Sequence, residues 1–339
     1  MSVDLRTQYL GFFLRNPIVA SAGPMTEDVD RLHRLEEAGV GAVVLPSLFQ
    51  EQIEHDEHEL HRLHLTGADS FSEATNYFPE LDDYNTGPDA YLEHIAQAKA
   101  AVRVPVIASL NGLSRSGWEQ FARLIEQAGA DALELNIYFV PTDPEMSSAD
   151  VEQQYVDLVA AVRQVVEIPL AVKIGPYFSA PLHLANRLAA AGADGLVVFN
   201  RYLQPDVDLE TLQVTPQLAL STPLEQRLPL QWIGIMYGNV KASLAHTTGV
   251  HSADGVIKSL LVGADVAMMT SALLMCGADY VKRVIGGVEQ WLEDHDYVSV
   301  EQMKGSLSRI NCPDPKSYER MNYMRALTSY TQSQSHQIT

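Results

Sequence analysis

The sequence has 339 residues, of which 46% are hydrophobic, and a formal net charge of −20 at pH 7. This length and apolar content are enough to bury one large core, so we expect one domain. The acidic charge, with no cluster of Lys and Arg to offset it, disfavours nucleic acid and anionic membranes as partners. Two cysteines exclude a disulfide framework and a cysteine-rich metal site.

The first residues lack a basic segment followed by an apolar core, and no apolar run of about 18 residues occurs in the chain. We therefore expect a cytoplasmic protein without a membrane segment. Residues 3–17 alternate and turn at Gly11, which predicts a hairpin.

One pattern then recurs along the chain: a helix, then Ala-Gly or Val-Gly, then a short apolar run. Each copy predicts a helix that stops at a left-handed glycine and turns into a buried strand. The glycines are Gly39, Gly129, Gly192 and Gly263. Between these copies, Pro105 and Pro169 end a helix and start a strand.

Together the two patterns predict eight strands, and apolar strands alternating with helices indicate a parallel sheet covered on both faces. The strands are expected near residues 18–21, 42–45, 106–109, 132–136, 170–173, 196–200, 243–247 and 266–270. We predict the α/β class and a (β/α)8 TIM barrel whose bottom the N-terminal hairpin closes. A doubly wound open sheet is the alternative, but residues 21–24 do not match its dinucleotide fingerprint.

Two long insertions interrupt the alternation, at residues 46–86 after the second strand and 201–221 after the sixth. Both leave the ends of strands at which barrel enzymes build active sites. The first contains four histidines spaced by three residues, which could gather metal ligands on one side of a helix. We favour a solvated, charged segment and predict no metal. The histidines are His55, His58, His61 and His64.

After Gly277 we expect a helix to about residue 293 and then a C-terminal helical extension. Its Tyr318, Met321, Met324 and Leu327 could dock on the barrel or on a neighbouring subunit. The predicted domain spans residues 1–331, and the polar tail 332–339 is expected to be disordered.

The sequence of residues 243–277 predicts a phosphate site. We expect a strand, a turn, a helix, a second strand and a second helix. The start of a helix offers free N–H groups and a positive dipole end. In TIM barrels the phosphate site recurs after strands seven and eight. Ordinary strand–helix units with polar turns are the alternative. The residues expected to contribute are Thr247, Thr248, Gly249, Thr270 and Ser271.

The order and spacing of several motifs resemble the class 1 dihydroorotate dehydrogenases, which are FMN-dependent (β/α)8 barrels. The resemblance runs from about Val3 to Gly305. It rests on Leu14-Arg15-Asn16-Pro17, Ala20-Ser21-Ala22-Gly23, Glu134-Leu135-Asn136, Val172-Lys173-Ile174-Gly175-Pro176-Tyr177-Phe178, Phe199-Asn200, the Thr-Thr-Gly-Val turn, Gly263-Ala264-Asp265, Thr270-Ser271-Ala272-Leu273 and Asp296 to Gly305.

The resemblance implies an FMN site. Thr248, Gly249, Thr270 and Ser271 would hold the flavin phosphate. Other implied cofactor contacts are Ser21, Ala22 and Gly23 against the ring, Ser47 and Asn136. Lys173 would face the flavin N1 and O2 region, where a cation favours the reduced anionic flavin. A structural lysine at a strand end is the alternative.

Three asparagines match residues that hold the planar carboxylate-and-imide ligand of the family, because neutral amides both donate and accept hydrogen bonds. They are Asn85, Asn136 and Asn200. Arg201, beside Asn200, brings a bidentate binder of carboxylate or phosphate to the pocket, unless it faces solvent.

The sequence departs from the family at two further positions. Phe139 stands where the family has the Cys or Ser base, and a phenyl ring cannot accept a proton. General-base catalysis contributes roughly 10²–10⁴-fold, so the standard reaction should be slow. Pro46 replaces a lysine that contacts the flavin.

We therefore expect an FMN-dependent oxidoreductase of the dihydroorotate dehydrogenase type, acting on CH–CH groups in pyrimidine biosynthesis and impaired at the base position. The alternatives are an FMN oxidoreductase with a different planar or anionic substrate, a non-catalytic relative that binds FMN or a partner, and a flavin-free barrel for a sugar phosphate. The resemblance also implies a homodimer, and a separate redox partner protein is conceivable.

Overall fold

The computed structural model describes residues 3–49, 52, 87–112, 115–216 and 218–335. Eight parallel strands form a closed barrel in the order β11-β12-β3-β4-β5-β6-β7-β8, which confirms the predicted TIM barrel. The strands are β3 (Ile18–Ala20), β4 (Ala42–Phe49), β5 (Val106–Asn111), β6 (Ala132–Asn136), β7 (Leu170–Ile174), β8 (Gly195–Val198), β11 (Ser243–His246) and β12 (Val266–Met269).

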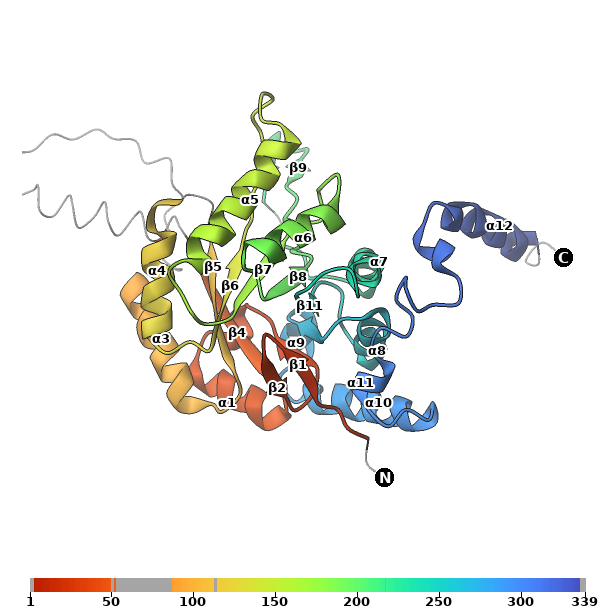
Figure 1. The fold of residues 1–339 in the computed structure, drawn as a ribbon, viewed down its shortest axis with the longest axis horizontal. Coiled ribbons are helices and arrows are strands. Elements are labelled where there is room, and N and C mark those ends of the chain that lie inside the picture. Colours follow the sequence, from red (N-terminus) through yellow and green to blue (C-terminus); the bar gives the residue numbers. More distant parts are fainter. Residues whose placement is uncertain (1–2, 50–51, 53–86, 113–114, 217, 336–339) are drawn as a thin grey trace, which may run out of the picture.

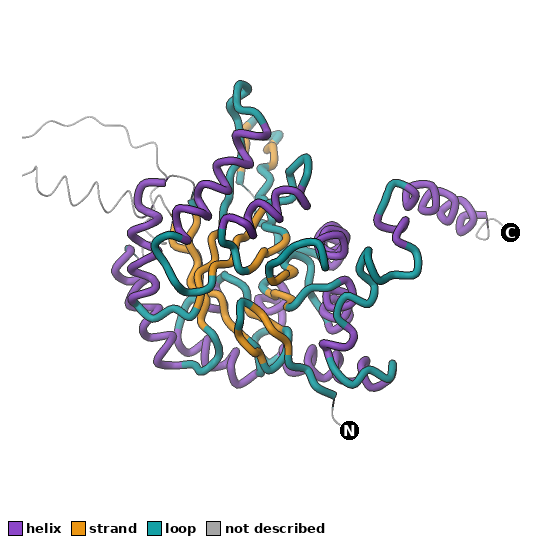
Figure 2. Tube along the Cα trace, in the orientation of Figure 1, coloured by secondary structure: helices purple, strands orange, loops and turns teal. Residues whose placement is uncertain are grey.

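Helices surround the strands (Figures 1 and 2). They are α1 (Val29–Ala38), α3 (Pro88–Ala101), α4 (Arg115–Gln127), α5 (Ser148–Arg163), α6 (Pro181–Ala191), α7 (Arg227–Met236), α8 (Ala253–Val262), α9 (Ser271–Cys276), α10 (Tyr280–Asp294) and α11 (Val300–Met303), with the short 3₁₀ helices η1 (Pro24–Thr26) and η2 (Pro223–Gln226). The four predicted helix-ending glycines all have φ between 97° and 114°, so each adopts the left-handed conformation that L side chains disfavour.

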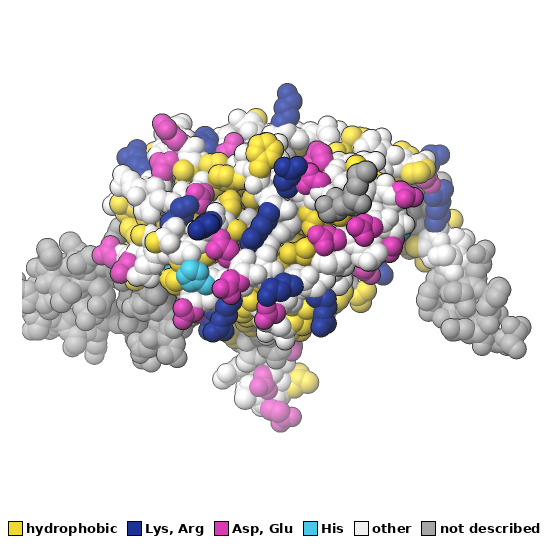
Figure 3. Space-filling view, turned by 90° about the horizontal axis from the view of Figure 1, so that it is seen from below, with side chains coloured by type: hydrophobic (Ala, Val, Ile, Leu, Met, Phe, Trp, Pro, Cys, Tyr) yellow, Lys and Arg dark blue, Asp and Glu magenta, His cyan; other side chains and the backbone are white. Residues whose placement is uncertain are grey.

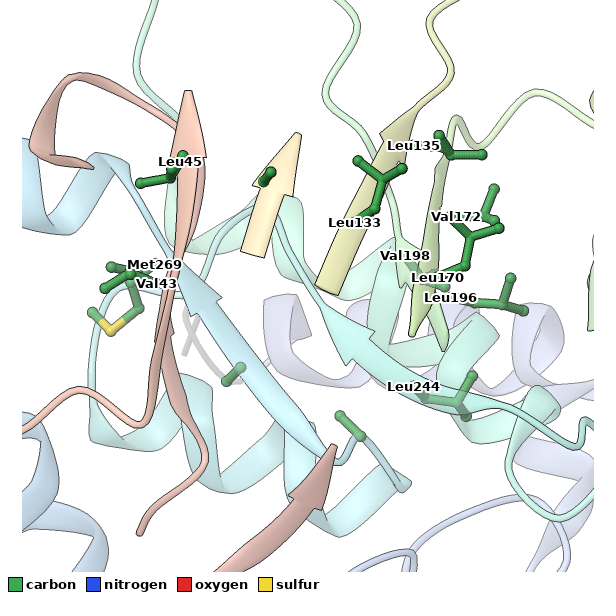
Figure 4. Packing of buried hydrophobic residues seen from close by; sticks show 14 of the residues in the cluster. Val43, Leu45, Leu133, Leu135, Leu170, Val172, Leu196, Val198, Leu244 and Met269 are labelled. Atoms are coloured by element: carbon green, nitrogen blue, oxygen red, sulfur yellow. The ribbon is translucent and has the colours of Figure 1, made fainter. Parts of the chain in front are cut away.

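Side chains alternate along each strand and build two cores. One face of each strand packs against the helices, and Leu133 and Leu135 of β6, labelled in Figure 4, belong to this outer cluster. The other face fills the barrel interior, where Ala132, Ala171 and Ala245 pack together.

The predicted hairpin is present as β1 (Thr7–Tyr9) and β2 (Phe12–Leu14). Its turn residues Leu10 and Gly11 have φ of 51° and 82°, the conformation of a tight two-residue hairpin. Tyr9, Leu10 and Leu14 are buried in the same cluster as the interior strand residues, so the hairpin closes the bottom of the barrel.

Two elements differ from the sequence prediction. Strand β4 does not stop at Leu45 but continues to Phe49, with a register shift between Val44 and Ser47. The irregularity accommodates Pro46, which has no N–H for the ladder. The second insertion contains an unpredicted hairpin of β9 (Asp206–Asp208) and β10 (Gln213–Thr215).

The C-terminal extension packs against the barrel at Tyr318. Tyr318 in η3 (Pro315–Tyr318) packs against Gly234 of α7, and its hydroxyl hydrogen-bonds to the Leu307 carbonyl at 2.5 Å. Helix α12 (Met321–Ser335) then lies away from the barrel (Figure 1), with Met324 and Leu327 exposed. The helix continues through Ser335, beyond the predicted start of the tail at residue 332.

Candidate active site at the mouth of the barrel

The barrel interior changes from apolar to polar toward the C-terminal ends of its strands. Two residues beyond Ala132 and Ala171 on the same strand faces lie Glu134 and Lys173. Ser21 and Thr270 continue the inward faces of β3 and β12 beyond the ends of those strands. The active-site end that TIM barrels use is therefore also the polar end of this barrel.

Most of the predicted site residues line one cavity of about 130 Å³ at this end. The residues brought together are Ser21, Ala22, Lys173, Asn200, Arg201, Thr247, Thr248, Gly249, Thr270 and Ser271. The predicted residues Gly23, Ser47 and Asn136 do not line it. Asn85 and the four spaced histidines lie outside the described residues.

The turn after β11 has an unusual backbone. Thr248 and Gly249 have consecutive positive φ values of 76° and 82°. A Cβ on Gly249 would lie 2.4 Å from the backbone nitrogen of Gln226, so only glycine permits this approach. The hydroxyl of Thr248 donates to the Phe199 carbonyl at 3.0 Å and ties the turn to the end of β8.

The structure corrects the predicted origin of the donors at this turn. Helix α8 begins only at Ala253, and the side chain of Ser252 caps it by accepting from the Gly255 N–H. The N–H groups near Thr248 and Gly249 therefore belong to a turn and not to a helix start. Only Ser271 opens a helix, the six-residue α9.

The turn and α9 carry donors that fit an anionic group. Within the described ranges, the N–H groups of Thr248, Gly249, Ser271 and Ala272 have no acceptor, and the Thr270 side chain caps nothing. Successive backbone N–H groups in such a turn form an anion-binding concavity. The residues present therefore fit a phosphate.

Lys173 supplies a buried cation to the same cavity. Its Nζ lies 3.6 Å from Oε1 of Glu134, and the two side chains are 10% and 0% exposed. Neither carboxylate oxygen of Glu134 has a hydrogen-bond donor among the described residues. Because a buried charge needs a partner, this pair keeps the ammonium at the centre of the mouth.

The two described asparagines that the sequence predicts to bind substrate bond to one another. Asn200 Nδ2 donates to Asn136 Oδ1 at 2.6 Å, and Asn136 Nδ2 donates to Ser47 Oγ at 3.3 Å. The Ser47 hydroxyl lies 2.8 Å from that of Ser109. A ligand that uses these amides would have to exchange some of these bonds.

Arg201 lies at the cavity but is already paired. Its Nε donates to Glu225 Oε1 at 2.7 Å, and its Nη1 donates to the Ala219 carbonyl. Burial would raise the pKa of Glu225, but hydrogen bonds from the Thr222 N–H and from Arg201 lower it overall. The carboxylate is thus ionised at neutral pH and offsets the charge of Arg201.

Aromatic side chains close the mouth on the side of β6 to β8. The Tyr202 hydroxyl accepts from the Phe139 N–H at 3.4 Å and donates to the Phe139 carbonyl at 3.1 Å. Its ring centroid lies 4.4 Å from that of Tyr138 and 5.4 Å from that of Tyr177. Phe139 itself is half-buried against the core.

A second cavity of about 360 Å³ adjoins these aromatic residues. It shares Asn200, Arg201 and Thr248 with the first and adds Tyr177, Tyr202 and Arg227. Arg227 is exposed and has no ion-pair partner among the described residues. This cavity therefore suits a planar group with a negative charge.

Sequence reasoning missed four polar residues of this region: Glu134, Ser109, Ser221 and His251. The two-residue period of the strands could have placed Glu134 and Ser109 inside the barrel. No local pattern predicts that Ser221, at the end of the insertion, returns to the cavity.

Fold and cavity together define a TIM-barrel protein with unpaired backbone donors and a buried cation at one cavity of the barrel mouth. The family model described as dihydroorotate dehydrogenase matches residues 4–292. The chain therefore belongs to the dihydroorotate dehydrogenase family. Members of this family are FMN-dependent oxidoreductases that act on CH–CH groups in pyrimidine biosynthesis.

Individual relatives are distant but cover most of the chain. The chain is 24% identical to dihydroorotate dehydrogenase B (NAD(+)), catalytic subunit, of Methanothermobacter thermautotrophicus, over 89% of this chain and 97% of that protein. It is 23% identical to the protein of the same name from Methanocaldococcus jannaschii, over 89% and 97%. For that of Listeria monocytogenes the identity is 26%, over 77% and 84%.

Among the described residues, no helix is long and apolar enough to cross a membrane. No group of three or more His, Cys, Asp or Glu side chains in that part of the chain is arranged to hold a metal ion.

Proposed function

We propose that this chain is itself an FMN-dependent oxidoreductase of the dihydroorotate dehydrogenase type, whose standard reaction oxidises dihydroorotate to orotate. The observation that carries the proposal is the position of the Lys173 side chain at the cavity. Its buried ammonium opens on the same cavity as the free donors of the turn at Thr248 and Gly249. When bound, FMN supplies a ring that accepts hydride, and Lys173 would offer positive charge where negative charge develops.

In this proposal the phosphate end of the cofactor lies at Thr248, Gly249, Thr270 and Ser271, and Ser21, Ala22 and Gly23 lie beside the ring. A Cβ on Gly23 would lie 2.8 Å from Cγ2 of Thr270, so glycine permits a close approach there. Ser47 and Asn136 do not line the cavity, so they would act on the cofactor only through Asn200, which lines it and bonds to Asn136.

The proposed activity on dihydroorotate is impaired, because Phe139 offers no proton acceptor. Tyr202 holds both backbone groups of Phe139, which supports a fixed position for this segment. No carboxylate or imidazole replaces the base among the residues that line either cavity, apart from Glu225, which Arg201 already engages.

A different planar or anionic substrate is the second candidate function. The second cavity favours it, since Arg227 and three aromatic residues line that space. A non-catalytic relative that binds FMN or a partner protein is the third reading, and it would retain the cofactor cavity without turnover.

The test is anaerobic mixing of the yellow FMN-loaded protein with dihydroorotate. Wild type should bleach far more slowly than a variant that combines Phe139→Cys with Pro46→Lys, in which we expect weak bleaching to return. The matched control combines Phe139→Ala with Pro46→Lys and removes the ring without adding a base. Bleaching of wild type as fast as that of the Cys variant would contradict a missing base. Colourless protein that does not bind added FMN would contradict the whole proposal.

We also propose that the protein is a homodimer, and the β9–β10 hairpin supports this. Val207 pairs with Val214 across the strands, and Leu209 and Leu212 extend the same face over the turn. The four side chains are 57–82% exposed, although such alternation is typical of a half-buried sheet. Leu212→Asp should therefore convert a dimer to a monomer in sedimentation experiments.

A separate redox partner and a cytoplasmic location stay predictions from the sequence.

A further inference from the structure

The insertion after β8 returns to the phosphate end of the cavity at Ser221. Both the N–H and the hydroxyl of Ser221 bond to Oγ of Ser271, at 3.1 and 2.9 Å. The Ser221 hydroxyl also lies 3.0 Å from Nε2 of His251. Ser221 and Ser271 line the cavity, whereas His251 does not.

The direction of these hydrogen bonds follows from counting protons. The geometry makes the Ser221 hydroxyl the donor to Ser271, and a hydroxyl has one proton. The contact with His251 therefore requires a proton on Nε2, which donates to Ser221. Ser271 receives two bonds through its oxygen, so its own proton remains free for the cavity.

Burial lowers the pKa of His251, against the opposing effects of the Ser221 backbone and the Glu225 charge. The imidazole is therefore neutral at pH 7. Its Nε2–H tautomer is the form that donates to Ser221 and so completes a hydrogen-bonded row of His251, Ser221 and Ser271. The Tyr280 hydroxyl donates to the His251 carbonyl at 3.1 Å and fixes the backbone of this residue.

We propose that His251 and Ser221 are positioning residues that orient the Ser271 hydroxyl as a donor to the cofactor phosphate. The inference rests on the proposed FMN site and adds two residues to it. Arg201 binds the Ala219 carbonyl two residues before Ser221, so the end of the insertion is held against the cavity by its own first residue.

The experiment compares the affinities of the flavin-free protein for FMN and for riboflavin, measured by quenching of flavin fluorescence. Riboflavin lacks the phosphate, so it reports the rest of the site. Ser271→Ala removes a hydrogen bond to a charged group and should weaken FMN roughly 10- to 100-fold. Ser221→Ala should weaken FMN roughly 10-fold, and riboflavin affinity should change less than about twofold in both variants.

The row also predicts how the substitutions combine. If Ser221 acts through Ser271, the double variant Ser221→Ala, Ser271→Ala should bind FMN as weakly as Ser271→Ala alone. His251→Gln keeps an N–H near the position of Nε2 and should retain FMN affinity, whereas His251→Leu should lose about as much as Ser221→Ala. Thr215→Ala, on the exposed hairpin, is the control.

Three outcomes would overturn the inference. Equal losses for FMN and riboflavin would show a merely structural role, additive losses in the double variant would show that Ser221 acts independently of Ser271, and full affinity in His251→Leu would remove His251 from the row. A wild-type protein that binds neither flavin would instead overturn the proposed function, and this inference with it. Retained riboflavin binding shows that a variant is folded.

Discussion

The two sides of the barrel mouth use their polar groups differently. On the side of β11 and β12, the N–H groups of Thr248, Gly249 and Ser271 remain without acceptors within the described part of the chain. On the side of β6 to β8, Asn136 and Asn200 bond to each other, and Arg201 bonds to Glu225.

This difference bears on which ligands each side can bind. Free backbone donors at a half-buried turn can bind a ligand without giving up existing hydrogen bonds, so the first side suits an anion. Groups that already hydrogen-bond to one another need no ligand. A ligand that binds them must replace those bonds, so it gains only the difference in free energy between the new and the old hydrogen bonds. In the proposed function the first side holds the cofactor phosphate and the second side meets the substrate, so they are called the cofactor side and the substrate side. Phe139 and Arg201 lie on the substrate side.

The largest effect is expected at Lys173 of β7, which lines the same cavity as the free donors. Lys173→Met would leave Glu134 buried without a cation, and breaking one partner of a buried pair costs about 3–5 kcal/mol. The free energy of unfolding, measured with urea, should fall by that amount. Adding Glu134→Gln should restore much of the loss, since no charge then stays buried. An unchanged free energy in Lys173→Met would mean that the pair contributes nothing.

Gly249→Ala tests the cofactor side next. The added Cβ would meet the backbone of Gln226, so the turn must shift and FMN affinity should fall about 100-fold, equivalent to about 2.7 kcal/mol. Gly11→Ala is the matched control, because Gly11 has the same φ of 82° but nothing within 4 Å of the added atom. Both variants carry the backbone strain, and only the first should lose FMN. Similar FMN affinities in the two variants would contradict a phosphate site at the turn of Thr248 and Gly249.

The contrast between the sides also explains what the sequence could predict. The barrel follows from local signals, such as the left-handed glycines at positions 39, 129, 192 and 263 and the apolar strands after them. The residues expected at the phosphate site lie directly after β11 and β12, so counting the strands is enough to predict their positions. The bonding of Arg201 to Glu225, and of Ser221 to Ser271, depends on how an insertion folds back, which no periodic pattern encodes. For the same reason the cap of α8 could not be placed.

A pH effect should arise beneath the cofactor side. His246 ends β11, is fully buried, and has its pKa lowered to about 3 by burial. The unfolded chain binds a proton at this histidine below a pH of about 6.5, whereas the folded protein does so only near pH 3, so the protein loses stability as the pH falls through this window. At pH 5.5 the loss relative to pH 7.5 should be about 1.4 kcal/mol.

The control is His246→Asn, whose amide can still reach Ser259, which lies 2.5 Å from Nδ1 of His246. This variant should lack that part of the pH dependence. An identical dependence in wild type and variant would assign the effect to other groups.

The smallest effect tests whether the substrate side is held closed. Tyr202→Phe keeps the ring that covers Gly175 but removes the hydroxyl that bonds both backbone groups of Phe139. Because a net hydrogen bond contributes about 1 kcal/mol, the free energy of unfolding should fall by about that amount, and the amide of Phe139 should exchange with solvent faster. Tyr177→Phe is the control, since the Tyr177 hydroxyl has no hydrogen-bond partner among the described residues and its side chain is 67% exposed. If both variants left the exchange at Phe139 unchanged, Tyr202 would not hold this segment. Faster exchange only in Tyr202→Phe would instead show that the Tyr202 hydroxyl fixes the backbone of residue 139, the position at which the proposed function lacks a base.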